Sequence, residues 1–121
     1  DAAPDGFRVL LHADPAAHRC GANAGVDPAD VLAHADGVVL PCTGDAAARA
    51  DVLAPFADRP AAATVAANLT VVSGLGGSPH TLAADARHAA ALGANALRLY
   101  HAGLASDDDL TAVREALDAL A

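Results

Sequence analysis

The chain has 121 residues, of which 54% are hydrophobic, and a formal net charge of −8, which indicates one compact globular domain over residues 1–121. The chain is acidic, and its basic residues, which are all arginines, form no cluster in the sequence. It therefore lacks the positively charged surface that binds nucleic acid or an anionic membrane. No apolar run approaches the ~20 residues that span a bilayer and no signal peptide is recognisable, so we predict a cytoplasmic protein with Cys20 and Cys42 as plain thiols.

The first two expected strand–helix units run from residue 7 to residue 57. The first strand covers 7–12, and the helix after it begins at Pro28 and ends near residue 36. Asp27 is suited to cap this helix, because its carboxylate accepts from free backbone N–H groups while Pro28 has no N–H to satisfy. The second strand covers 38–42, and a Thr-Gly-Asp turn leads into a helix over 46–57.

The third unit has the clearest helix start. Its strand lies within 63–73 and is centred on 69–72, and a glycine-containing loop follows it. Ser78 is the predicted cap, Pro79 takes the first helical position and Gly93 supplies the left-handed stop. Helix three is therefore expected between these residues.

The fourth unit ends the chain. Its strand covers 96–101 and its helix begins at Ser106, where the carboxylates of Asp107–Asp109 favour the positive end of the helix dipole. Apolar residues recur at helical spacing along this helix and predict one buried stripe. They are Leu110, Val113, Leu117 and Leu120.

Four apolar strands, each followed by a helix, predict an α/β fold with a parallel sheet. Four consecutive βα units are half of a TIM-type (β/α)8 barrel, and the alternative is a small open doubly wound sheet. We expect a fragment or half-barrel, whose missing strands come from a second copy (self-association) or from a missing N-terminal half of the parent chain. In either case the site is expected at the carboxyl ends of the strands.

The segment 93–104, together with residues 35–41, resembles the closing half of uncharacterised alanine-rich actinobacterial TIM-barrel proteins that look like glycoside hydrolases. The last strand of those proteins reads Gly-Ala, an apolar pair, then Arg-Phe-Tyr and a turn through Tyr-Gly. The resemblance implies a barrel and carries over no catalytic residue. Arg98, Tyr100 and Gly103 fit the pattern, whereas Leu99, His101 and Ala102 depart from it.

Polar side chains crowd the end of the fourth strand. Alternation puts Arg98 and Tyr100 on one face and His101 on the other. Arg98 is suited to hold a carboxylate or a sugar hydroxyl, Tyr100 to orient it, and His101 to act as acid or base. A structural pairing of Arg98 with an aspartate is the other interpretation.

The glycine-rich loop at 73–78 offers a second candidate site. Backbone N–H groups at a helix start can hold a phosphate, and the loop would follow strand seven of a barrel. Against this, no Arg or Lys flanks the loop, and Gly76 and Gly77 also suit a tight turn. The loop residues considered for binding are Gly74, Gly76, Gly77 and Ser78.

His12 and Asp14 end the first strand and are candidate catalytic residues at the mouth. The pair lacks the His-x-His of metal-dependent barrel hydrolases, so we expect no metal and no cofactor. A glycosidase carboxylate pair is also missing, because Glu115 is the only glutamate and lies on the fourth helix. Cys42 has no marked base beside it that would make it a nucleophile.

The sequence favours a TIM-barrel-type enzyme or enzyme fragment that acts on a small, sugar-like molecule. His12, Asp14 and His101 are the candidate catalytic residues, and Asn68, Arg98 and Tyr100 the candidate binding residues. One alternative is a sugar-phosphate isomerase or lyase that uses the glycine loop. Another is a non-catalytic half-barrel module that associates through its sheet edges.

Overall fold

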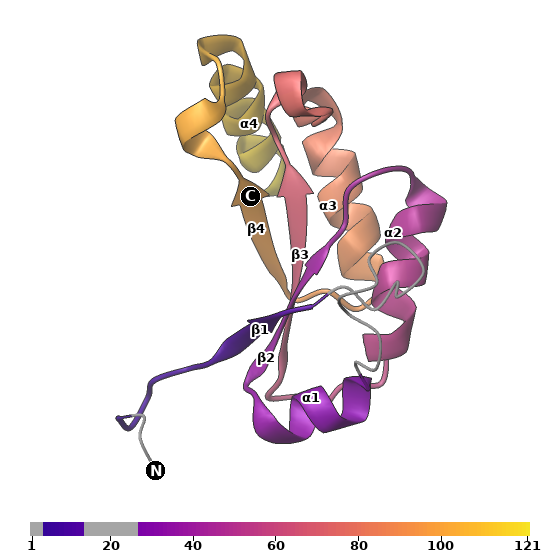
Figure 1. Cartoon of the computed structure of the whole chain (residues 1–121). Coiled ribbons are helices and arrows are strands. Elements are labelled where there is room, and N and C mark those ends of the chain that lie inside the picture. Colours follow the sequence, from indigo (N-terminus) through magenta and orange to yellow (C-terminus); the bar gives the residue numbers. More distant parts are fainter. Residues whose placement is uncertain (1–3, 14–26) are drawn as a thin grey trace.

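The computed structural model describes residues 4–13 and 27–121. Within these ranges the chain forms an α/β fold around one parallel sheet of four strands, in the order β1-β2-β3-β4 (Figure 1). Neighbours in the sheet are therefore neighbours in the sequence. The strands are β1 Leu10–His12, β2 Gly37–Pro41, β3 Thr64–Thr70 and β4 Ala96–Tyr100.

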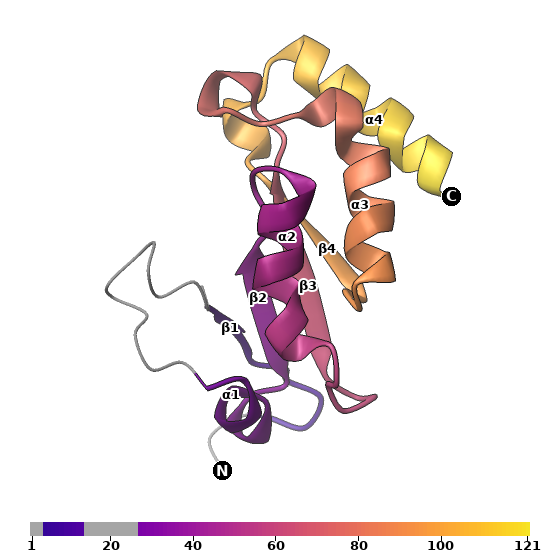
Figure 2. The ribbon, with the colours of Figure 1, turned by 90° about the vertical axis from the view of Figure 1, so that its right-hand side faces the viewer.

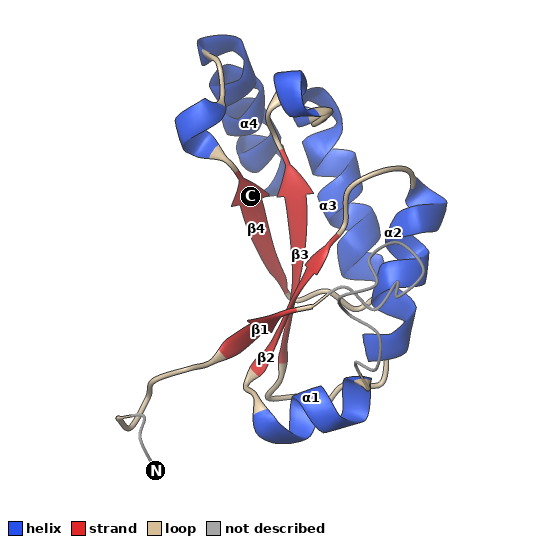
Figure 3. Cartoon of the chain, viewed as in Figure 1, coloured by secondary structure: helices blue, strands red, loops and turns tan. Residues whose placement is uncertain are grey.

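A helix follows each strand (Figure 3), which confirms the predicted alternation of strands and helices. The helices are α1 Pro28–His34, α2 Ala46–Leu53, α3 Leu82–Ala91 and α4 Asp107–Leu120. Short 3-10 turns extend or precede them. These turns are η2 Ala54–Phe56, η3 Ser73–Leu75, η4 Pro79–Thr81 and η5 Ala102–Leu104.

Local chemistry explains most of the helix ends. The side chain of Asp27 accepts from the N–H groups of residues 29 and 30, and Asp45 accepts from residue 48. Ser106 forms a reciprocal capping box with Asp109 at the start of α4. Gly93, with φ of 103°, lies just beyond α3 in the left-handed region that glycine adopts without strain.

Ser78 does not cap helix three, contrary to the sequence prediction. Its side chain makes no capping hydrogen bond; a 3-10 turn follows it, and α3 begins only at Leu82. The loop after β3 is thus longer than a single capped turn.

Three further bounds differ clearly from the prediction, two of them because strand pairing sets them and one because of a proline. β1 is shorter than 7–12, since only its last three residues pair with β2. β3 begins at Thr64 and so includes the alanine-rich segment, which pairs with both β2 and β4. α2 ends at Leu53 because Pro55 has no N–H to continue the α-helical pattern.

The helices gather on one side of the sheet, as Figures 1 and 2 show for α2, α3 and α4. The apolar core lies between them and the sheet and includes Val38, Leu40, Val65 and Leu69, with Val31 of α1 packed against it. Strand residues of the opposite alternation, such as Val39 and Ala66, lie outside this core. The described helices α2, α3 and α4 lie on the other side of the sheet, so we call this side the open face, although Val39 and Ala66 themselves are buried.

The strand order differs from that of a doubly wound sheet, the alternative that the sequence left open. A doubly wound sheet carries helices on both faces and reverses its strand order, whereas here the order is consecutive and the helices share one face.

In the described ranges, no helix has the length and apolar character that crossing a membrane requires.

Candidate functional site

Polar side chains collect on the open face at the carboxyl ends of β3 and β4. In the sheet register Asn68 lies beside Arg98, and Thr70 lies beside Tyr100. Residues opposite one another in adjacent parallel strands project to the same face, so these four side chains form one polar group. The register therefore brings the predicted binding residues Asn68, Arg98 and Tyr100 onto one face of the sheet.

A hollow of about 470 Å³ lies on the same side of the sheet but at the amino ends of the strands, because the first residues of β1, β3 and β4 line it. Arg8 donates to the Thr64 hydroxyl at 2.6 Å, and both residues line the hollow together with Arg98. No acidic side chain is among the described lining residues. The lining residues are Arg8, Leu10, Thr64, Asn95, Ala96 and Arg98.

The charge on this open face contrasts with that of the whole chain. Among the described strand residues that alternate onto this face there are His12, Arg98 and no Asp or Glu, although the chain has a net charge of −8. The described acidic residues lie on helices and loops instead. The open face is thus a locally basic surface on an acidic protein.

The candidate catalytic residues are separated. His12 lies on β1, beside Val39, and is exposed. His101 follows β4, with its ring edge-to-face against that of Tyr100 at 5.1 Å between centroids. Asp14 lies outside the described residues. Two strands stand between His12 and β4 in the sheet, so the sheet register alone does not bring His12 and His101 together.

The glycine loop after β3 uses its N–H groups internally. Those of Leu75 and Gly77 donate to the Val72 carbonyl, that of Gly76 donates to Ser73, and that of Ser78 donates to Thr70. These groups already have acceptors, so in this conformation they do not form a cradle for a phosphate. Gly77 is needed for close packing, because a Cβ there would lie 2.6 Å from the Thr70 carbonyl oxygen.

Asp109 joins this loop to the start of α4. Its carboxylate accepts from the Ser73 hydroxyl at 2.5 Å and from the Ser106 N–H at 3.1 Å. Hydrogen bonds from the Ser73 side chain and then the Ser106 backbone hold the pKa of Asp109 below its ordinary value of 3.8. The loop after β3 and the first turn of α4 are therefore one connected unit.

A buried ionic cluster lies behind the sheet, between α2 and α3. Arg49 is 3% exposed; its Nη2 lies 2.8 Å from an Asp85 carboxylate oxygen and its Nη1 lies 2.9 Å from His88 Nδ1. Because a guanidinium only donates, Nδ1 must be the accepting, unprotonated nitrogen of His88. The buried Nε of Arg49 has no partner among the described residues.

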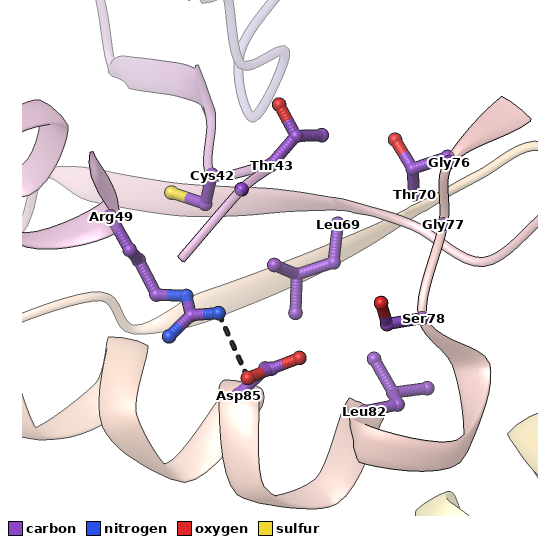
Figure 4. A pocket seen from close by; sticks show the side chains of 11 residues that line it. Cys42, Thr43, Arg49, Leu69, Thr70, Gly76, Gly77, Ser78, Leu82 and Asp85 are labelled. Carbon is purple, nitrogen blue, oxygen red and sulfur yellow. Dashed lines mark ion pairs between the residues drawn. The ribbon is translucent and has the colours of Figure 1, made fainter. Parts of the chain in front are cut away.

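This cluster borders a small cavity of about 30 Å³ at the carboxyl ends of β2 and β3 (Figure 4). Cys42, Thr70 and Ser78 also line the cavity. The volume suits about one water molecule and is too small for a sugar. Burial raises the pKa of the Cys42 thiol to about 11, against the opposing charge of Arg49, so the thiol is protonated at neutral pH and is no nucleophile there.

The sequence interpretation missed this cluster. The available signal was spacing: Arg49 lies three and four residues before Val52 and Leu53, on the buried side of α2. Asp85 and His88, three apart on α3, share one face and meet it.

The described residues contain no group of three or more His, Cys, Asp or Glu side chains that would hold a metal ion. Searches of protein-family models, curated proteins and solved structures found no match for this chain.

Proposed function

We propose that the chain is half of an eight-stranded (β/α)8 barrel, with the open face as the barrel interior. Consecutive strand order and helices on one side of the sheet support this proposal. Small residues also occupy the middle of the open face, where Val39 and Ala66 are buried side by side. A barrel interior needs such residues, since side chains from all its strands fill it.

We further propose that the open face binds a small polyhydroxy carboxylate, a sugar acid, with its carboxylate at the hollow near the amino ends of the strands and its hydroxyl groups toward Asn68 and Tyr100. The observation that carries this proposal is the hollow lined by Arg8 and Arg98 with no acid among its described lining residues. A guanidinium recognises a carboxylate through paired, charge-assisted hydrogen bonds. Asn68 and Tyr100, on the same face, supply donors and acceptors for hydroxyl groups.

Turnover of that ligand would fall to His12, Asp14 and His101, which remain the candidate acid–base residues of a barrel enzyme resembling glycoside hydrolases. The contact of His101 with Tyr100, two residues after Arg98, supports His101 most directly. A general acid or base must reach the proton that it transfers. His101 therefore serves a ligand held at Arg98 better than His12 does.

The sugar-phosphate alternative through Gly74–Ser78 has less support. Its loop N–H groups are engaged by carbonyls of the same segment, and Asp109, an acid, contacts Ser73 at the loop's start. A phosphate would instead meet positive charge at Arg8 and Arg98. The two sites are separable, because the Arg98 side chain lies on β4 and the loop follows β3.

The test is calorimetric titration of the chain with glucuronate, galacturonate, gluconate, glucose and glucose 6-phosphate. We expect at least one of the three acids to bind more tightly than glucose, and Arg98→Ala to weaken that binding about tenfold or more, since a hydrogen bond to a charged group contributes about 1.5–3 kcal/mol. Arg114→Ala, at an exposed position on α4, is the matched control and should bind like the original chain.

Failure of all three acids to bind at millimolar concentration would refute the proposed ligand class. Equal binding by Arg98→Ala would refute the proposed site. Binding of glucose 6-phosphate that survives Arg98→Ala would move support to the glycine loop.

A further inference from the structure

Large apolar side chains stand uncovered along the first strand and the segment before it. Phe7, Val9 and Leu11 are 63%, 49% and 44% exposed. They alternate along an extended segment, and Leu11 lies beside Val38, a core residue on the helix side of the sheet. The three side chains therefore point to the side where helices belong, yet no described helix covers them.

A second uncovered apolar strip lies at the opposite end of the module, on and before α4. Leu110 and Leu117 are seven residues apart on one stripe of the helix and are 39% and 44% exposed. Leu104, in the turn before the helix, is 58% exposed. This exposed stripe of α4 runs beside the buried stripe of the same helix, which contains Ala112 and Ala116.

Both strips follow from the same regularity of the fold. In a right-handed βα repeat, the helix after one strand covers that strand and the next one. α4 follows β4, but the described chain has no strand beyond β4. At the other end, no helix of the described residues lies before β1, and Figure 1 shows β1 and β4 as the two outer strands.

We propose that a second copy of this chain fills both positions, with α4 of each copy lying on Phe7, Val9 and Leu11 of the other. β4 of each copy then pairs with β1 of its partner in parallel, and a two-fold axis relates the copies. This arrangement closes the sheet at eight strands and leaves no unpaired edge. The inference rests on the half-barrel proposed above and adds its partner.

The area available is sufficient for a specific complex. Six side chains that are each about half exposed contribute on the order of 500 Å² per copy, hence about 1,000 Å² over the symmetric pair, which is the size that a specific interface needs. The two strand pairings add to this area. A one-sided, head-to-tail contact would instead generate an open filament.

Light scattering coupled to gel filtration tests the proposal on the 121-residue chain. We expect a species of twice the 11.9 kDa chain mass, and a dissociation constant raised about tenfold or more by Leu117→Asp, because a charge in the apolar contact lacks a partner. Leu75→Asp changes a side chain that is 54% exposed on the loop after β3 and should leave the dimer intact.

A chemical cross-link identifies the contact independently of folding defects. In a Cys20→Ser background, Val9→Cys and Leu117→Cys chains are mixed and oxidised mildly. We expect disulfide-linked pairs of one chain with the other and few pairs of either chain with itself. Circular dichroism confirms that each variant is folded.

A monomer at about 100 μM, a ladder of species growing without limit, or cross-linking within like chains would each overturn the proposal. Its failure is distinguishable from failure of the proposed function. The Val9 and Leu117 side chains belong to the helix side of the sheet, whereas Arg98 lies on the open face, so a monomer that still binds a sugar acid would refute only the proposed dimer.

Discussion

Arg49 shows at the scale of one residue how this alanine-rich chain stabilises a polar contact inside its helix layer. Its guanidinium joins Asp85 and His88 of α3 to α2, where small alanine side chains leave room for it. A buried charge of this kind is costly unless it is paired. The pair therefore fixes how α2 and α3 pack more than it increases stability.

Replacing Arg49 tests this interpretation. Arg49→Met keeps the side-chain length but leaves Asp85 without its cation, and we expect a loss of about 2–3 kcal/mol in the free energy of unfolding, measured with urea. The expected loss is smaller than the ~3–5 kcal/mol that removing one partner of a fully buried ion pair costs. The Asp85 side chain is 26% exposed, so solvent screens its charge.

Arg114→Met, at an exposed position, is the control and should change stability by less than about 0.5 kcal/mol. Adding Asp85→Leu to Arg49→Met should recover part of the loss, since no unpaired charge then remains. Equal losses for Arg49→Met and Arg114→Met would show that the cluster is dispensable.

At the scale of elements, Asp109 joins α4, on which it lies, to the 3-10 turn η3 after β3 through Ser73 and to the capping residue Ser106. The loop after β3 and the beginning of α4 both border the carboxyl end of the sheet. A change in one of them will therefore be transmitted to the other through a single carboxylate.

Acid should release this connection. The pKa of Asp109 is lower in the folded chain than its ordinary value of 3.8, so the stabilisation is complete above that value and disappears as the pH falls through the folded pKa. Melting temperatures from pH 7 to pH 2 should show Asp109→Asn less stable than the original chain at neutral pH, with the gap closing in acid. Asp108→Asn, exposed on the same turn, should show no such closing gap.

Gly77 and Gly74 form a matched pair within one loop. A Cβ at Gly77 would lie within 2.7 Å of backbone atoms of Thr70 and Val72, whereas at Gly74 it meets nothing within 4 Å. We expect Gly77→Ala to cost about 1–3 kcal/mol of unfolding free energy and Gly74→Ala to be neutral or slightly stabilising. Equal effects in thermal unfolding would contradict the close packing of this turn.

The ends of helices were predictable where one short segment contains both the hydrogen-bond donor and the acceptor that define the end. The caps at Asp27 and Ser106 and the stop at Gly93 are of this kind. The start of β3 and the cap at Ser78 were not, because sheet pairing and the connection to Asp109 decide them. Strand alternation predicts that Arg98 and Tyr100 share one face of the sheet. The Arg49 cluster could not be predicted in this way, because it depends on how α2 and α3 pack against each other.

At the scale of the whole molecule, the chain is a row of βα units in which every strand pairs only with its neighbour in sequence. β3 has seven residues and lies between two strands, while β1 has three and pairs on one side. Stability should therefore be unequal along the row, with the outer unit opening before the middle.

Hydrogen exchange measures this gradient. In dilute solution we expect the amides of β3 to exchange last and those of β1 first. If two copies close on one another, exchange in β1 should slow as the concentration rises, while exchange in β3 changes little. Concentration-independent exchange in β1 would indicate that no partner covers it.

The consecutive strand order also has a consequence for synthesis. Each new strand meets its sheet partner as soon as its own unit has left the ribosome, without waiting for a distant segment. The sheet can therefore assemble one strand at a time in the order of translation, and only its outermost edges wait for completion.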